Sequence, residues 1–294
     1  MQLEEILSEL ENNTGKFPSL ALERAIEERE AITPVLLASL EEYKNKQEEL
    51  LEKPEYILHI YALYLLAQFQ EPLAYSLIVE FFSTPGDISL DVTGDVVTED
   101  LGRILASVSH GNIEPIKALI ENKTINEYVR SAALESLLVL IAQQVIPREK
   151  VIQYYDELFS NIGGEEYDYT WTKLVIHSAK ICAVELKEQI DRVFEEDLVE
   201  QFFIRQKDVN DSLQLGIEVA LNKLSENHRY SFIEDVISEM KWWACFQQET
   251  KNKANNISVT KEEFNRSFNK SKNQIKKKKQ MQKEARRKNR PKKK

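Results

Sequence analysis

The residues best suited to chemistry are scattered along the chain. None of its four histidines, His59, His110, His177 and His228, stands in a known metal-ligand spacing with another histidine, a cysteine or an acid pair. The two cysteines lie far apart and share no metal-ligand spacing either. We therefore expect core or surface roles for these side chains, with no metal and no cofactor.

A second candidate is the acidic stretch between residues 83 and 100. The segment STPGDISLDVTGDVV (83–97) holds one proline and two glycines, and it predicts a long loop between helices. Loops of this length in a compact helical protein are functional or mobile. Three aspartates at four-residue spacing suggest a cation site, but they do not follow the alternating spacing of an EF-hand. A solvated acidic loop is the better interpretation, and its candidate interaction residues are Asp87, Asp91, Asp95, Glu99 and Asp100.

Catalytic motifs are absent from the sequence. It contains no G-x-S-x-G, no G-x-x-x-x-G-K-[ST] and no G-x-G-x-x-G. Adjacent acids such as Glu165 and Glu166 are usual on solvated faces of a chain with 49 acidic residues. We therefore predict that the protein is not an enzyme, and an enzyme with a groove site near residues 83–100 is the weakest alternative.

Two adjacent tryptophans, Trp242 and Trp243, follow Ile237 and Met240 at the end of the last predicted repeat helix. Neighbouring positions on a helix diverge by about 100°. We expect one indole to plug the end of the helical array and the other to be partly exposed. A capping role is favoured over a ligand site, although an interaction role stays open.

These residues must be positioned by helices, and the clearest pair spans Lys123–Phe159. Thr124 and Glu127 have capping-box spacing, and Pro147 stands where a first helical residue belongs. Arg130 is a charged residue inside the apolar stretch, and we expect it to tie neighbouring repeats together. An αα-hairpin cannot bury its apolar face alone, so it needs neighbours of the same kind.

The rest of the chain repeats this unit. Helical periodicity follows six of the eight prolines, and the two similar Glu-Pro helices, 69–82 and 112–123, place these dipeptides 43 residues apart. Two helices in about 40 residues are typical of HEAT-type repeats. We predict an all-α fold, a HEAT-like α-solenoid of about a dozen helices. We expect helices to begin near these six prolines, which are Pro18, Pro34, Pro54, Pro72, Pro115 and Pro147.

The net charge of −10 divides unevenly along the chain. Residues 270–294 hold 14 basic residues and one acid, whereas residues 1–269 hold 25 basic and 48 acidic residues. We predict a helical-repeat domain (1–247), a linker or the start of an exposed helix (248–269), and a disordered or solvated helical tail (270–294). The tail suits phosphate contacts with RNA or DNA, and equally an acidic protein, anionic lipid or the chain's own acidic body. Its candidate contact residues are Lys276, Lys277, Lys278, Lys279, Arg286 and Arg287.

The N-terminal residues and the composition indicate the cellular compartment that we expect for the protein. The N-terminus, MQLEEILSELENN, is acidic and lacks the basic start and apolar run of a signal peptide. No apolar run approaches the roughly 20 residues of a membrane span. Two cysteines are too few for a disulfide framework. We therefore expect a cytoplasmic protein.

Residues 96–142, VVTEDLGRILASVSHGNIEPIKALIENKTINEYVRSAALESLLVLIA, resemble a bacterial family catalogued as domain of unknown function 1186. A weaker likeness covers most of residues 1–245. The resemblance implies a helical, HEAT-like fold and supplies no activity or catalytic residue. Many members end in a zinc-binding SEC-C motif, but this chain has no cysteine after Cys245, so zinc is not implied.

Together these features predict a non-enzymatic scaffold that binds a protein partner on an α-solenoid, with the tail adding an electrostatic contact. The alternative is a nucleic-acid or ribosome-associated protein that binds mainly through residues 270–294. That alternative predicts an affinity that falls steeply with salt and is lost with the tail.

Overall fold

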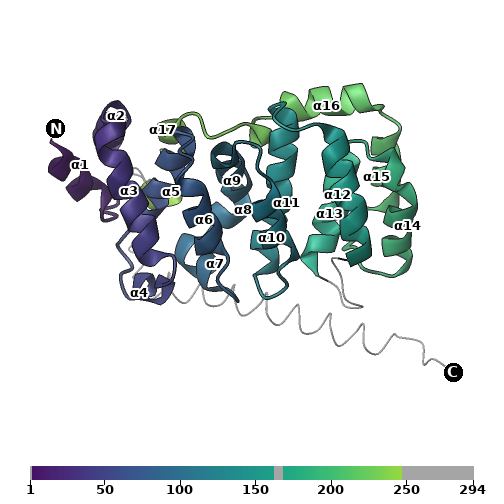
Figure 1. Ribbon diagram of the computed structural model, residues 1–294, viewed down its shortest axis with the longest axis horizontal. Coiled ribbons are helices and arrows are strands. Elements are labelled where there is room, and N and C mark those ends of the chain that lie inside the picture. Colours follow the sequence, from purple (N-terminus) through teal and green to yellow (C-terminus); the bar gives the residue numbers. More distant parts are fainter. Residues whose placement is uncertain (1, 162–167, 247–294) are drawn as a thin grey trace, which may run out of the picture. The chain divides into compact units, whose positions relative to one another are not determined.

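The computed structural model describes residues 2–161 and 168–246 (Figure 1). In this part of the chain there are 17 α-helices, 13 of them with at least seven residues, and no β-strands. The all-α prediction is therefore confirmed. The compact unit ends at Phe246, so the predicted linker and basic tail lie outside the described residues. No helix of the described chain is both long and apolar enough to cross a membrane.

A row of helices forms the centre of the unit, and each helix contacts the next. The row runs through α3 (Arg29–Tyr43), α5 (Leu58–Gln68), α9 (Leu101–Ser109), α11 (Glu127–Ala142), α13 (Tyr169–Lys180) and α15 (Gln206–Leu213). A contact to the next repeat at every step is the mark of a helical-repeat array. Almost every residue of α5 and α11 is buried, as expected for interior helices.

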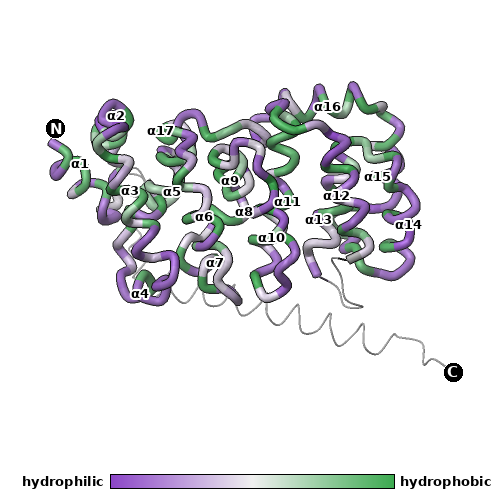
Figure 2. Tube along the Cα trace, in the orientation of Figure 1, coloured by the Kyte–Doolittle hydropathy of each residue, from purple (hydrophilic) through white to green (hydrophobic). Residues whose placement is uncertain are grey.

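Other helices pack against this row. They are α6 (Ala74–Phe82) on α3 and α9, α10 (Glu114–Glu121) on α11, and α12 (Arg148–Asn161) on α13. At the N-terminal end, α1 (Leu3–Leu10) packs on α2 (Ser19–Glu27), and α4 (Gln47–Leu51) follows α3. Hydrophobic and hydrophilic stretches alternate along most helices, as amphipathic packing requires, whereas α14 (Lys187–Glu195) is mostly hydrophilic (Figure 2).

Buried arginines link one helix to the carbonyl end of another. Arg130 on α11 donates from Nε to the Ile120 carbonyl at the end of α10 (2.8 Å), and it also pairs with Asp168, which caps α13. Arg148 on α12 donates to the Ile181 carbonyl just after α13 (2.7 Å). Cations stabilise helix C-termini because unpaired carbonyls concentrate negative charge there. The prediction that Arg130 joins neighbouring repeats is confirmed.

Several helices end on a left-handed residue that is not glycine. Gln70, Gln144, Cys182 and Asp197 have φ between 50° and 57°. In each case the next amide donates to a carbonyl five residues back, for example Val145 N to Leu140 O at 2.9 Å. This is the Schellman bond pattern. Because glycine usually marks such ends, these four helix ends could not be recognised from their local sequence.

Residues 227–246, the return segment, lead away from α16 (Ile217–Ser225) and run back along the row. Their helix α17 (Val236–Met240) contacts α2 and α5 in the N-terminal part of the array (Figure 1). The rings of Phe246 and Phe17 meet at 5.3 Å. The chain therefore ends its described part beside its first helices.

Polar side chains of the row bind the backbone of the return segment. Gln143, which directly follows α11, donates to the Tyr230 carbonyl (3.0 Å), and Arg103 on α9 donates to the Phe232 carbonyl (3.0 Å). The Val236 amide donates to a side-chain oxygen at the end of α5 (2.8 Å). Tyr230 and Val236 are themselves buried. The segment is thus an integral part of the core.

Three local predictions were wrong. Residues 83–97 are not a long loop, because they form α7 (Ile88–Thr93) and α8 (Val96–Glu99), helices too short for periodicity to reveal. Thr124 does not cap α11; the side chain of Asn126 accepts from the Tyr128 amide instead. Pro34 does not begin a helix but lies inside α3.

Candidate functional site

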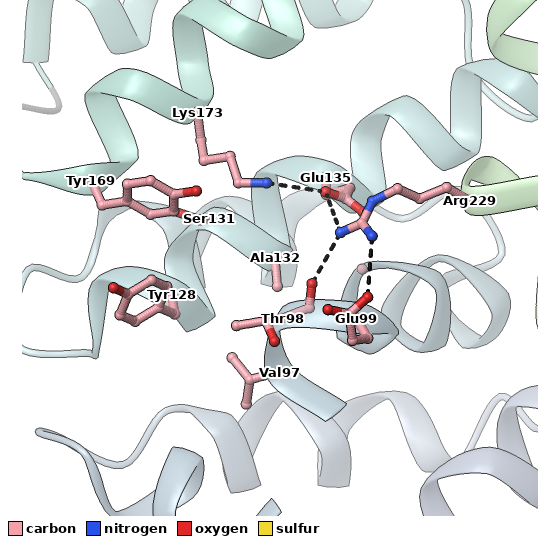
Figure 3. Close-up of a pocket in the computed structure, with 11 residues that line it drawn as sticks. Val97, Thr98, Glu99, Tyr128, Ser131, Ala132, Glu135, Tyr169, Lys173 and Arg229 are labelled. Atoms are coloured by element: carbon pink, nitrogen blue, oxygen red, sulfur yellow. Dashed lines mark hydrogen bonds and ion pairs between the residues drawn. The ribbon is translucent and has the colours of Figure 1, made fainter. Parts of the chain in front are cut away.

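A cavity of about 200 Å³ opens between α8, α9, α11 and α13 (Figure 3). Its floor depends on Gly102 of α9, because a Cβ there would stand 2.9 Å from the Ala132 carbonyl of α11. That distance is too short for any larger residue, so glycine sets the close approach of these two helices. The lining residues are Val97, Thr98, Glu99, Gly102, Tyr128, Ser131, Ala132, Glu135, Tyr169, Lys173 and Arg229.

A buried carboxylate, Glu135 on α11, stands at the centre of the charged wall. Its side chain is 7% exposed, and its oxygens lie 2.9 Å from Arg229 Nε and 3.4 Å from Lys173 Nζ. Arg229 comes from the return segment, and it also donates to the Thr98 carbonyl (3.0 Å) and contacts Glu99 (3.4 Å). Residues from α8, α11, α13 and the return segment are therefore joined in one ion-pair network (Figure 3).

Two further basic groups on α13 stand near Glu135. Burial lowers the pKa of Lys180, and the neighbouring cations Lys173 and Arg229 lower it further, while Glu135 opposes them. His177 Nε2 is 3.8 Å from the Glu135 carboxylate, but burial and the same cations hold the pKa of His177 well below its usual value. The imidazole is therefore neutral at pH 7, and the cations that pair with Glu135 are Lys173 and Arg229.

Four aromatic rings lead from the cavity to solvent. Tyr128 and Tyr169 line the cavity with ring centroids 5.2 Å apart, Tyr169 meets Phe203 at 5.4 Å, and Phe203 meets Phe202 at 5.3 Å. Exposure rises along this aromatic ladder to 53% for Phe203 and 87% for Phe202. The ladder joins an exposed apolar surface to the polar cavity.

The acidic residues predicted as one interaction loop are separated by the structure. Glu99 lines the cavity. Asp100 instead accepts from the Tyr64 hydroxyl (2.6 Å) and binds Arg103, which makes it a structural residue. Asp87 precedes α7, and its carboxylate accepts from the side-chain Nδ2 of Asn126 (2.6 Å).

Asp91 and Asp95, the other two residues of this group, are exposed on α7 and immediately before α8. Within the described residues, no three His, Cys, Asp or Glu side chains gather into a group that could hold a metal ion. The three aspartates of the series are therefore not brought together in such a group.

One tryptophan of the pair is packed and the other is exposed, as predicted, but both follow α17 instead of lying on a helix. Trp243 packs edge-on against Tyr64 of α5 (5.6 Å), whereas Trp242 is 72% exposed. The packed indole does not plug the C-terminal end of the array, because the return segment has carried it back to the N-terminal repeats. The predicted contact residues Lys276–Lys279, Arg286 and Arg287 lie outside the described residues.

Most residues of this site could not be predicted from the sequence. Arg229 lies 94 residues from Glu135, and Lys173 lies 38 residues from it, so neither pair forms a local motif. One signal was available: Glu135 is a charged residue inside the apolar stretch 127–142. Phe202 and Phe203 gave none, because they stand in the apolar run FFI (202–204).

The fold and the site define an all-α helical-repeat protein with a charged cavity between consecutive repeats. The chain belongs to the family described as "Protein of unknown function (DUF1186)", whose model matches residues 1–247. An uncharacterized protein from Chlamydia trachomatis serovar D is 36% identical over 247 residues, which is 83% of this chain and 96% of the relative. An uncharacterized protein from Chlamydia muridarum is also 36% identical, over 83% of this chain and 97% of its own length. No solved structure gives a significant match.

Proposed function

We propose that the protein is a non-enzymatic scaffold that binds a partner protein through the aromatic ladder. The exposure of Phe202 (87%) and Phe203 (53%) carries this proposal. Contiguous exposed apolar side chains mark interaction sites, and aromatic residues dominate the binding energy of interfaces. A partner that covered Phe202 would gain roughly 1.5–3 kcal/mol from that side chain alone.

Ring contacts support the proposal because they pre-order the exposed surface. Phe203 rests between Tyr169 and Phe202, so its rotamer is restricted before any partner arrives. Restricting a side chain beforehand reduces the entropy lost on binding. The base of the ladder is fixed as well, because the Tyr169 amide donates to Glu127 on α11 (2.8 Å).

A photo-crosslinking experiment tests the proposal in the native host. A photoreactive phenylalanine analogue at position 202 should crosslink to a defined partner, and excess unlabelled wild-type protein should compete for it. The double variant Phe202→Ser/Phe203→Ser should bind that partner at least tenfold more weakly, because both anchors are removed. The affinity of each purified form for the crosslinked partner is the measurement.

The matched control is Leu73→Ser, which removes another large apolar side chain that is 68% exposed. This control should retain wild-type affinity, and both variants should keep wild-type circular dichroism. A double variant that binds the partner as tightly as wild type would refute a role for the ladder.

The basic tail supports a second candidate function, binding of nucleic acid. Residues 270–294 carry 14 basic residues against one acid. If about six of them contact phosphates, the logarithm of the affinity for single-stranded RNA should fall with the logarithm of salt with a slope of about −4. Fluorescence anisotropy with a labelled RNA measures this slope. Deleting residues 270–294 should abolish binding, and salt-independent binding would exclude this function.

A further inference from the structure

We propose that the cavity beside Glu135 binds a small organic anion, a carboxylate or a phosphate monoester on a planar apolar body. The anionic group would pair with Lys173, and the planar body would lie against Tyr128 and Tyr169. The inference goes beyond partner binding, because it concerns the interior of the cavity and not the exposed end of the ladder.

Lys173 is the side chain best able to receive the anion. Its ammonium has three donors. Its Nζ lies 3.4 Å from the nearest carboxylate oxygen of Glu135. This distance is longer than an ordinary N–H···O hydrogen bond of about 2.7–3.2 Å. The side chain is 20% exposed and lines the cavity, and Nζ lies 6.0 Å from the centre of the Tyr169 ring. The Lys173 ammonium can therefore donate a hydrogen bond to a ligand, and it does so from a partly buried position.

Arg229 differs from Lys173 because its donors are engaged. It binds Glu135 (2.9 Å), the Thr98 carbonyl (3.0 Å) and Glu99 (3.4 Å). Arg229 would attract the anion through its positive charge and hold the wall of the cavity in place, while keeping these three contacts. Burial is the main cause of the lowered pKa of Lys180, and repulsion from Lys173 and Arg229 adds to it. A bound anion would relieve that repulsion.

The uncharged surfaces of the cavity favour an organic anion over a bare ion. Two tyrosine rings, Tyr128 and Tyr169, form one side (Figure 3), and Val97 and Ala132 are apolar lining residues. An apolar cavity of about 150 Å³ is enough for benzene. The present cavity of about 200 Å³ has room for an aromatic ring with one anionic substituent.

Calorimetric titration of the full chain tests this inference with four probes: benzoate, phenyl phosphate, the neutral benzamide and inorganic phosphate. Benzoate or phenyl phosphate should bind one to one, at least tenfold more tightly than benzamide. Tighter binding of benzoate would identify carboxylates as the class, and tighter binding of phenyl phosphate would identify phosphate monoesters. Inorganic phosphate that bound as tightly as phenyl phosphate would overturn the proposed role of the aromatic wall.

Two variants locate the binding. Lys173→Met should weaken the preferred anion at least tenfold, whereas Lys150→Met, on the exposed side of α12, should leave its affinity unchanged. Ala132→Leu fills the cavity floor without altering a charge, and it should also block binding. The proposal is overturned if neither aromatic anion binds more tightly than benzamide, or if a folded Lys173→Met or Ala132→Leu protein keeps wild-type affinity.

Discussion

Replacing Arg103 with methionine should lower the free energy of unfolding by about 3–5 kcal/mol. The Arg103 side chain is 3% exposed, and it pairs with Asp100 at 2.9 Å and with Glu239 at 2.6 Å. It also donates to the carbonyls of Ser231 and Phe232, both at 3.0 Å. Methionine fills most of the volume but leaves two carboxylates, each about 15% exposed, without their cation. The loss should therefore exceed that of a simple cavity.

Urea unfolding measures this loss, and hydrogen exchange shows where it acts. Exchange should accelerate most at the amides of Ile233 and Val236, because Arg103 holds the return segment beside them. The matched control is Arg205→Met, which removes an exposed i,i+3 pair with Asp208 and should change stability by less than about 0.5 kcal/mol. If Arg103→Met unfolds within 1 kcal/mol of wild type, the return segment does not depend on this arginine.

The long helices were predictable because periodicity needs several turns to become visible. The apolar positions of α5 and α11 recur over three or more turns, and both helices are buried as their patterns indicate. α7 and α8 have six and four residues, so no stripe can be recognised. Glycine and aspartate near their ends then gave the segment the composition of a loop.

The candidate site was less predictable because its contacts are not local. Arg229 reaches the Thr98 carbonyl across 131 residues, and Arg103 reaches the return segment across 128 or more. Nothing near Arg229 in the sequence distinguishes it from a surface arginine. Only the position of the return segment on the row makes it part of the cavity, and that position depends on tertiary packing rather than on helix propensity.

Acidification should destabilise the protein through His59 of α5, by about 3 kcal/mol between pH 6.5 and pH 4. The ring is 3% exposed, stacks on Tyr56 (5.8 Å), and Nε2 lies 3.0 Å from the Val92 carbonyl of α7. Burial lowers the pKa of His59 to about 4, from 6.5 in the unfolded chain. Between pH 6.5 and pH 4, His59 is therefore protonated in the unfolded state but stays neutral in the folded state. Each unit of pKa difference is worth 1.36 kcal/mol, so stability falls until the pH reaches about 4.

His59→Gln separates this contribution from the carboxylates that titrate in the same range. Glutamine keeps an N–H donor for the Val92 carbonyl but cannot titrate, so the loss of stability between pH 7 and pH 4.5 should be smaller than in wild type by about 2.5 kcal/mol. Urea unfolding at each pH gives the two slopes. His110→Asn is the control, because His110 is exposed and asparagine tolerates its left-handed backbone (φ 48°). His177, also buried and neutral, should still destabilise the His59→Gln protein in acid. Equal slopes for wild type and His59→Gln would mean that His59 accepts its proton without unfolding.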